Sequence, residues 1–505
     1  MKKNPLHDNS YQRVLIALPG GGNPMYFSYY LEILKLLKKS GINVLLVETL
    51  QPNLKSFTPW MLDFCFRKYS QYRFQTIDLK KVRRHKATET QKSSGYFDTE
   101  FSTMSDLILH STEHPSLGKS LYSEFATAVA LTSDPNFSVI HMQNRIHRMI
   151  RKYLYSHDKS RLAVASFQPD AIIVLNGRFL QQAASKDVAA DYSIPVYFLE
   201  HGGQPGEKYH LELFQTQDRL EFQKSYLGDV AKTHIPKEKI DALLFQYQTN
   251  SLLNPFIANR FIQESKKNGQ GPLASIFTSS IDEEVSCPNW NNDNVENLTN
   301  RTISISNYLM GRGYQVIVAI HPNAMNKSWT DLSLQVRMLT QNGIAFMPPW
   351  SDLSSYKLLV DSDLVVTWRS TIGLEAAAYG KDLLVISDSH FDLILSEEQS
   401  DLSHFGHYFP FTIDNQNAAK EYLFHLRNHG HQITQELDKK DKLFLSFMYV
   451  LMPLGGVRRA LQRRIRPIFN LISRKYTPSD YFWLLKKLRF HNYKQLEKKL
   501  FYRAD

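Results

Sequence analysis

Cysteine is almost absent from this chain, and its scarcity excludes two kinds of site. Only Cys65 and Cys287 occur among 505 residues, and they lie far apart with no CxxC pair. A disulfide framework and a cysteine-based zinc site are therefore not expected. We expect both residues to be small buried apolar side chains, in a protein suited to a reducing cytoplasm.

Long apolar runs are absent as well. A membrane-spanning helix needs about 20 apolar residues, whereas the longest approach, residues 443–454, reads only LFLSFMYVLMPL. The N-terminal stretch MKKNPLHDN lacks the apolar centre of a signal peptide. On these grounds we expect no transmembrane helix and no signal peptide.

Net charge is missing from most of the chain. The formal net charge is +11, and residues 457–505 alone hold fourteen Lys or Arg and three Asp or Glu, an excess of the same size. In this tail, basic residues alternate with aliphatic and aromatic ones at helical spacing, which is typical of helices on anionic membranes. The alternatives are a helix packed on the body and, least favoured, a nucleic-acid patch. We therefore expect a peripheral protein on the cytoplasmic face of the membrane.

The rest of the sequence has the composition and pattern of a globular α/β protein. Hydrophobic residues make up 43% of the chain and charged residues 22%. Apolar runs of strand length alternate with helical stretches before and after a polar linker near 250–272. This pattern predicts two Rossmann-like domains facing a cleft, followed by a basic helical tail. The predicted parts are residues 1–255, with helical insertions over 50–165, then residues 270–430, and the tail at 431–505.

The strongest functional signal lies between residues 320 and 386. One predicted strand ends at His321, and Ser370 and Thr371 separate another strand from a small-residue helix that holds Glu375. Ligands of open α/β sheets bind at the carboxyl ends of parallel strands, so these residues predict a nucleotide-phosphate pocket. The imidazole and the hydroxyls would contact phosphate, and the carboxylate would accept hydrogen bonds from ribose. The alternatives are a loop histidine, a plain N-cap and a capping-box glutamate.

Two loops are weaker candidates for ligand contact. Ser279 and Ser280 follow the first strand of the second domain, where a loop can lie across a diphosphate. Gly21 and Gly22 would let the backbone approach a ligand, although a plain turn is the alternative. The stretch 361–363 (Asp-Ser-Asp) precedes an apolar strand, which favours a structural role, so no metal is expected.

Four residues of the first domain follow predicted strands and are expected to face the same cleft. An inverting transferase needs one general base that removes the proton of the acceptor hydroxyl. Glu200 and His201 are the candidates for this base, and Arg178 and Asn176 are candidate acceptor contacts. Ordinary strand-end loops are the alternative.

The second domain also resembles a known enzyme family. The segments IFTSSIDEE, IHPN and SSYKLLVDSDLVVTWRSTIGLEAAAYGKDLLVI occur in this order over residues 270–390, with Trp290 after the first. This sequence resembles the bacterial glycosyltransferases of capsule and surface-polysaccharide biosynthesis, which have the GT-B fold. The same His-Pro and Ser-Ser/Thr elements recur in bacterial sialyl-, Kdo- and CDP-glycerol transferases. The resemblance implies that His321 and Ser370-Thr371 contact the phosphate of a donor. The acidic base motif of the sialyltransferases is not evident in the first domain.

The combined interpretation is an inverting, metal-independent GT-B glycosyltransferase that needs no cofactor. It would transfer a sugar from a nucleotide-sugar donor to a glycan or lipid-linked glycan acceptor, as in the synthesis of capsule or the O-antigen of lipopolysaccharide. Two other enzymes on the same fold are alternatives: a CDP-alditol phosphotransferase of teichoic-acid type and a nucleotide-sugar epimerase. A basic nucleic-acid-binding protein is the non-enzymatic alternative.

Overall fold

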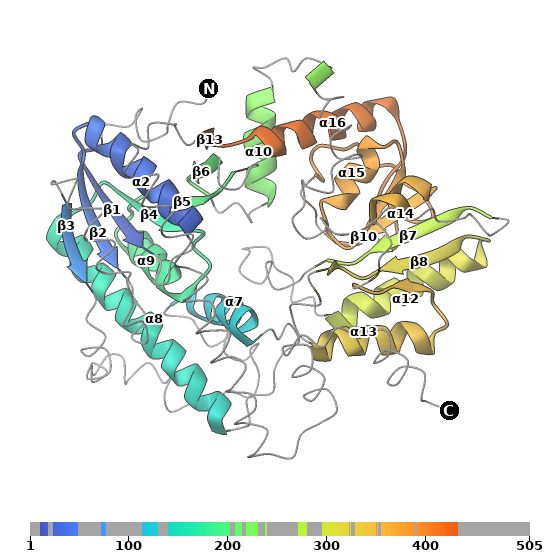
Figure 1. The fold of residues 1–505 in the computed structure, drawn as a ribbon, viewed down its shortest axis with the longest axis horizontal. Coiled ribbons are helices and arrows are strands. Elements are labelled where there is room, and N and C mark those ends of the chain that lie inside the picture. Colours follow the sequence, from blue (N-terminus) through green and yellow to red (C-terminus); the bar gives the residue numbers. More distant parts are fainter. Residues whose placement is uncertain are drawn as a thin grey trace.

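The structure consists of two α/β lobes side by side, with the N-terminal lobe in blue to green and the C-terminal lobe in yellow to orange (Figure 1). Cys65, Cys287 and the basic tail lie outside the residues that it describes. This computed structural model describes residues 11–18, 24–48, 72–76, 114–129, 140–202, 208–214, 219–230, 238–239, 271–279, 295–322, 324, 329–349, 351, 355–387, 389 and 391–432.

A seven-stranded sheet forms the N-terminal lobe, in the order β13-β6-β5-β4-β1-β2-β3. The five strands from β5 to β3 in this order are parallel to their neighbours. By contrast, β6 runs antiparallel to both β5 and β13. The strands are β1 (Arg13–Leu18), β2 (Asn43–Glu48), β3 (Tyr72–Thr76), β4 (Ala171–Leu175), β5 (Val196–His201), β6 (Lys208–Glu212) and β13 (His431–Gln432).

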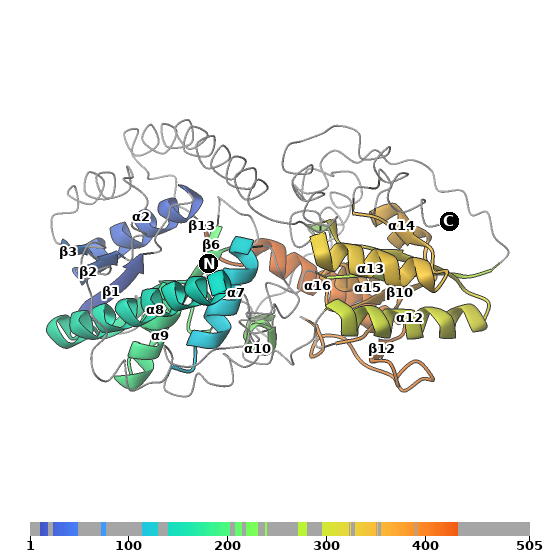
Figure 2. The same cartoon turned by 90° about the horizontal axis from the view of Figure 1, so that it is seen from below.

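Successive side chains of a strand point to opposite faces, so this sheet has a core on each side. On β1, Ile16 lies in the core against α2, and Leu15 lies in the core against α8 and α9. Figure 2 shows α2 on one side of the strands and α8 and α9 on the other. The helices of the lobe are α2 (Pro24–Lys39), α7 (Leu117–Val129), α8 (Ile140–Phe167) and α9 (Leu180–Asp191).

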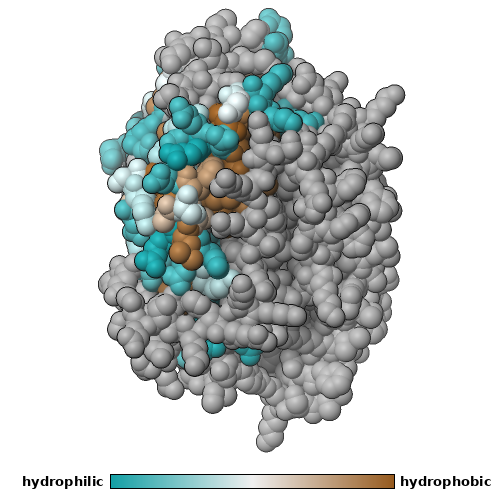
Figure 3. Space-filling model, turned by 90° about the vertical axis from the view of Figure 1, so that its left-hand side faces the viewer, coloured by the Kyte–Doolittle hydropathy of each residue, from teal (hydrophilic) through white to brown (hydrophobic). Residues whose placement is uncertain are grey.

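The surface of the described N-terminal lobe is mixed. Figure 3 shows its outer side, where a strip of hydrophobic residues lies beside hydrophilic ones. Leu162 of α8, which is 57% exposed, is one of the large apolar side chains that reach solvent. In the described part of the chain, no helix combines the length and apolar character needed to cross a membrane.

A six-stranded sheet forms the C-terminal lobe, in the order β12-β11-β10-β7-β8-β9. All neighbours are parallel except β12, which pairs antiparallel at one edge. Phe277, the last residue of β7, lies opposite Ala319 of β8 and Thr367 of β10. The strands are β7 (Leu273–Phe277), β8 (Gln315–Ala319), β9 (Phe346–Met347), β10 (Leu364–Thr367), β11 (Asp382–Val385) and β12 (His407–Phe409).

Helices cover both faces of this second sheet. Ile276 and Val318 belong to the core on the side of α12 and α13. Phe277 and Ala319, one residue further on, belong to the core on the side of α14, α15 and α16. The helices are α12 (Val295–Gly311), α13 (Trp329–Gln341), α14 (Ser355–Asp361), α15 (Ile372–Ala378) and α16 (Ile413–Asn428).

An interlobe junction consists of α10 (Arg219–Val230) and of residues 429–432, which follow α16. Side chains of α10 lie in the core of the C-terminal lobe. The side-chain amide of Gln223 donates to Ser389 O at 3.1 Å and accepts from Leu393 N–H at 2.6 Å. The chain then returns to the N-terminal lobe, because β13 pairs with β6. In Figure 1, α16 extends from the C-terminal lobe toward the N-terminal one, and α10 lies between the lobes.

Most elements follow the predicted alternation of apolar strands and helices, and the apolar runs AIIVL and LASIF form β4 and β7. The segment 50–165 differs, because it contains β3 where the sequence predicts only helices. Helix α10 falls within the predicted domain 1–255 but packs into the core of the other lobe. Residues 431–432, predicted as part of the tail, add a strand to the N-terminal sheet.

A buried hydrogen bond attaches α12 to its sheet. Trp368 Nε1 donates to Thr302 Oγ1 at 2.8 Å, and both side chains are buried. We predict that Thr302→Val lowers the free energy of unfolding by about 1–3 kcal/mol, because the buried indole N–H loses its acceptor. Thr299→Val on the same helix is the control, since the described bond of the Thr299 hydroxyl is a donation to Val295 O. Urea denaturation measures both variants, and equal losses would contradict the prediction.

Candidate functional site

The carboxyl ends of four parallel strands form one edge of the second sheet. This C-lobe edge comprises residues 278–279, 320–322, 368–371 and 386–387, which follow β7, β8, β10 and β11. Such edges are the usual ligand sites of open α/β sheets, so this one is the candidate donor site. Four predicted site residues lie on it: Ser279, His321, Ser370 and Thr371.

Hydrogen bonds join the turns of the C-lobe edge. The backbone N–H of His321 donates to Thr278 Oγ1 at 2.9 Å. The backbone N–H of Arg369 donates to Ser279 Oγ at 3.3 Å. The turns after β8 and β10 are therefore both attached to the turn after β7. His321 and Ser279 are half-buried, so they are partly open to a ligand.

Ser370 and Thr371 precede α15, which has seven residues. Thr371 is the N-cap residue, yet its side chain makes no capping hydrogen bond and the residue is exposed. Ser370 Oγ instead accepts from the N–H of Ile372 at 3.4 Å. Ser370 therefore accepts the hydrogen bond at the start of α15, and the hydroxyl of the exposed residue Thr371 makes no such bond. Phosphate contact by either residue stays a prediction.

Glu375 is buried within α15, next to the turn that carries Thr371. It is the fourth helical residue, one beyond the capping-box position, so that interpretation does not apply. Tyr356 of α14 donates its hydroxyl to Glu375 Oε1 at 3.3 Å. Burial raises the pKa of Glu375 to about 7, and the Tyr356 hydrogen bond opposes this rise. Near neutral pH the carboxyl group can thus either donate or accept a hydrogen bond.

Arg369 is a functional candidate that the sequence reasoning missed. Its side chain is buried at the C-lobe edge, and Nη2 donates to the hydroxyl of Ser387, which follows β11. A guanidinium stays charged at any ordinary pH, so this edge contains a fixed positive charge. The signal was an arginine at the end of the apolar run LVVTW, next to Ser370.

A second polar group lies in the N-terminal lobe, at the ends of β4 and β5. Asn176, with φ of 59°, donates its side-chain amide to the carboxylate of Glu200. Glu200 Oε1 accepts from the N–H of His201 at 3.0 Å and lies 3.8 Å from His201 Nε2. The carboxylate is buried, whereas the imidazole side chain is 47% exposed. A carboxylate beside an exposed imidazole is an arrangement that can orient a general base.

Among the described contacts, none joins Arg178 to the C-lobe edge or to the pair Glu200 and His201. The Arg178 guanidinium packs over the ring of Phe179, 4.9 Å from its centroid. Gly21, Gly22 and Ser280 lie outside the described residues, so their predicted roles stay predictions.

The acidic stretch 361–363 bonds to the protein itself. Its three side chains contact the ammonium of Lys357, the hydroxyl of Ser275 and the backbone N–H of Leu273. Within the described residues, a group with metal-ligand spacing lies instead where β6 contacts the interlobe junction and consists of His210, Glu212 and His429.

Comparisons with known proteins find similarity at the level of structure only. No protein-family model matches the chain, and no curated sequence matches it either. KpsC of Thermosulfurimonas dismutans, a beta Kdo 2,4 transferase, shares 14% identity over 50% of this chain and 79% of its own, with a TM-score of 0.34. The UDP-GlcNAc 2-epimerase of Methanocaldococcus jannaschii shares 13% over 87% of this chain and 99% of its own, with a TM-score of 0.28. SsfS6, a glycosyltransferase of Streptomyces sp. SF2575, shares 12% over 75% and 82%, with a TM-score of 0.19. Similarities of this size do not establish a family or an activity for this chain.

The raised pKa of Glu375 predicts a pH-dependent stability. With a pKa of about 7 in the folded chain and an ordinary value of 4.5, the ionised group opposes folding. The free energy of unfolding therefore starts to fall as the pH rises above 4.5, and it stops falling above about pH 7. The total loss is about 3 kcal/mol. We predict that Glu375→Gln raises the free energy of unfolding by about this amount at about pH 8 and changes it little at about pH 4. Chemical denaturation at both pH values measures this, with the exposed Glu296→Gln as the control. A pH-independent difference would contradict the prediction.

Proposed function

We propose that the protein is a GT-B glycosyltransferase of surface-polysaccharide biosynthesis. It transfers a sugar from a nucleotide-sugar donor at the C-lobe edge to a glycan acceptor at the N-terminal lobe, with inversion and without a metal ion. The observation that carries the proposal is the joining of three strand-end turns into one polar edge, through the bonds from His321 to Thr278 and from Arg369 to Ser279.

The C-lobe edge offers the groups that a nucleotide diphosphate needs. The ring N–H of His321 and the hydroxyls of Ser279 and Thr371 donate to phosphate oxygens. The buried Arg369 supplies positive charge close to them. Glu375 meets a ribose hydroxyl as donor or acceptor, depending on its protonation.

The reaction breaks one bond and forms one. The acceptor hydroxyl oxygen attacks the anomeric carbon, and the bond from that carbon to the phosphate oxygen breaks, so the nucleotide leaves with the electron pair. His321 stabilises the charge that develops on the leaving phosphate. His201 takes the proton of the acceptor hydroxyl, because its ring is exposed and lies beside the buried carboxylate of Glu200.

The same donor edge would also serve an epimerase, which acts on a nucleotide-sugar without an acceptor. Labelled CMP-, CDP-, UDP- and GDP-linked substrates, each with and without acceptor glycans, separate the possibilities. Sugar transfer that requires an acceptor supports the proposal. A changed free donor identifies an epimerase, and transfer of an alditol phosphate identifies the phosphotransferase.

Removal of the His321 side chain tests its role in departure of the nucleotide. We predict that His321→Ala lowers kcat by about 10²–10³-fold, because one donor to the developing charge is lost. The fold should persist, since the side chain is only half-buried. His404→Ala is the control, because His404 is an exposed histidine of the same lobe between β11 and β12. Steady-state kinetics with the substrate pair from the screen measures both, and wild-type turnover in His321→Ala would rule out the assigned role.

We also propose that the protein lies on the cytoplasmic face of the membrane, and deletion of the basic tail tests this location. Residues 457–505 carry fourteen of the 60 Lys and Arg residues. We predict that the full chain sediments with phosphatidylserine-containing vesicles at about 0.1 M salt, and that deletion of these residues abolishes this. Vesicles of neutral lipid are the control. Undiminished sedimentation of the shortened chain would show that the tail is not the anchor, and strongly salt-dependent binding to DNA would favour the nucleic-acid alternative.

A further inference from the structure

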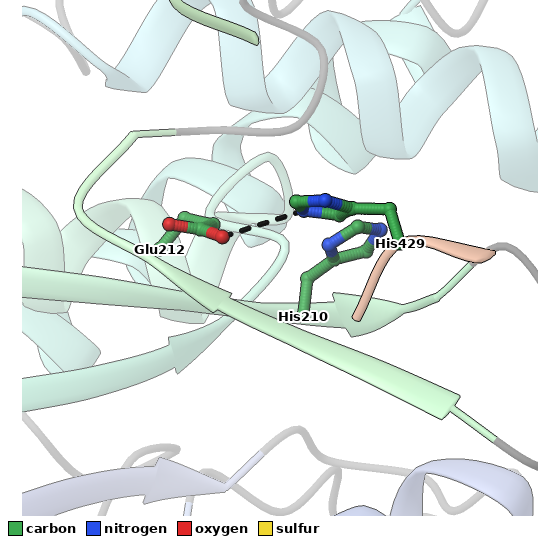
Figure 4. Close-up of side chains that lie close together, drawn as sticks. All are labelled: His210, Glu212 and His429. Carbon is green, nitrogen blue, oxygen red and sulfur yellow. Dashed lines mark ion pairs between the residues drawn. The ribbon is translucent and has the colours of Figure 1, made fainter. Parts of the chain in front are cut away.

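Two histidines and a glutamate meet where β6 contacts the interlobe junction. His210 and Glu212 lie two residues apart on β6, so their side chains share one face of the sheet. His429 directly follows α16. The ligand atoms of the three residues all lie within 4.8 Å of one another, and Figure 4 shows the side chains converging. Both histidines are buried and the glutamate is half-buried.

We propose that His210, Glu212 and His429 bind a divalent transition-metal ion, with zinc as the best match. Two imidazoles and one carboxylate form a ligand set that suits Zn²⁺ and Co²⁺. Tetrahedral zinc with bonds of about 2.1 Å places its ligand atoms about 3.4 Å apart. Glu212 Oε1 and His429 Nε2 already lie 3.4 Å apart. Side-chain rotation within the 4.8 Å set brings in the third ligand.

The backbone turn before β13 places His429 in this group. The register of β13, with His431 opposite Tyr209, would put residue 429 beside Leu211, whose side chain lies in the core against α2. Gly430 interrupts this register with a φ of 110°, which favours glycine. A Cβ at Gly430 would meet Tyr209 O at 2.8 Å. The turn at Gly430 therefore directs the His429 side chain away from the face that carries Leu211 and toward the opposite face, which carries His210.

Aromatic side chains enclose the group. The rings of His210 and His429 lie 4.2 Å apart between centroids. Phe222 of α10 lies 5.8 Å from His210 and 5.1 Å from His429. His425 of α16 lies 4.7 Å from His429. Rings packed in this way limit the access of solvent to a metal.

The position of the group indicates what the ion would do. Two ligands belong to β6 of the N-terminal lobe, and the third ends the helix whose side chains lie in the core of the C-terminal lobe. The ion would therefore hold the returning chain against the first sheet, as a structural link between the lobes. This role is separate from the proposed transfer reaction and does not depend on it.

Metal titration of the full chain tests the inference. After treatment with a chelator and its removal, we expect added zinc to bind at one Zn²⁺ per chain by elemental analysis and to raise the Tm. Co²⁺ should give the visible absorption of tetrahedral nitrogen and oxygen ligation, without a thiolate band. The variants His210→Ala, Glu212→Gln and His429→Ala should each lose at least about 100-fold in affinity for zinc. Loss of a residue that only hydrogen-bonds to a metal ligand lowers metal affinity by at most about 100-fold.

His431→Ala is the matched control, because this neighbouring histidine of β13 packs at 5.5 Å from the ring of Tyr209 and lies outside the group. It should bind zinc like the wild type. Glu212→Gln preserves the volume of the side chain, and circular dichroism verifies that it folds. A folded wild-type chain that binds no zinc would overturn the inference and leave only the ion pair between Glu212 and His429. Unchanged affinity in both His210→Ala and His429→Ala would overturn it as well.

Discussion

The parallel pairing of β7 with both of its neighbours is the constraint on which the candidate site depends. Phe277 lies opposite Ala319 and Thr367, so the three strands end at one level and their turns meet. A slip by one residue would move every side chain of a strand to the opposite face. It would also separate His321 from Thr278, which accepts its backbone N–H. The apolar cores on both faces of the sheet therefore hold the polar edge in register.

Strand pairing also connects Glu200 and His201 to the interlobe junction. Glu200 of β5 lies opposite His210 of β6, and β6 in turn pairs with β13, where the chain returns from the C-terminal lobe. The strand that carries the candidate base is thus one strand away from the interlobe junction. Displacement of α16 relative to the first lobe would act first on β13 and β6, and through their hydrogen bonds on β5.

The sequence predicted much of this architecture and only part of the candidate site. Apolar runs bounded by polar or Pro residues identified β4 and β7, because burial on both faces requires such runs. It did not predict β3, β6 or β13, since YRFQT, KYHLE and HQ carry polar residues that mask a strand pattern. His321 and Ser370 were predicted to lie at the C-lobe edge because they come shortly after apolar strands. His429 was not found, because only the crossover of the chain places it beside His210 and Glu212.

Charge distribution decides how an anion can be recognised at the C-lobe edge. The excess of basic residues belongs to the tail, and the other residues balance to zero, so they exert little long-range attraction on a phosphate. Recognition then depends on groups in direct contact. The backbone N–H groups of His321 and Arg369 donate to Thr278 Oγ1 and Ser279 Oγ, so the turns that carry the His321 ring and the Arg369 guanidinium are held in place before any ligand arrives. Donors that need no reorganisation contribute more to the stabilisation of a developing charge than mobile surface lysines would. Residues 270–430, which contain the C-terminal lobe, hold nine Lys or Arg and eighteen Asp or Glu, so this lobe as a whole is acidic. An ordered polar edge on such a lobe is therefore suited to select a phosphate by local geometry and contact rather than by the overall charge.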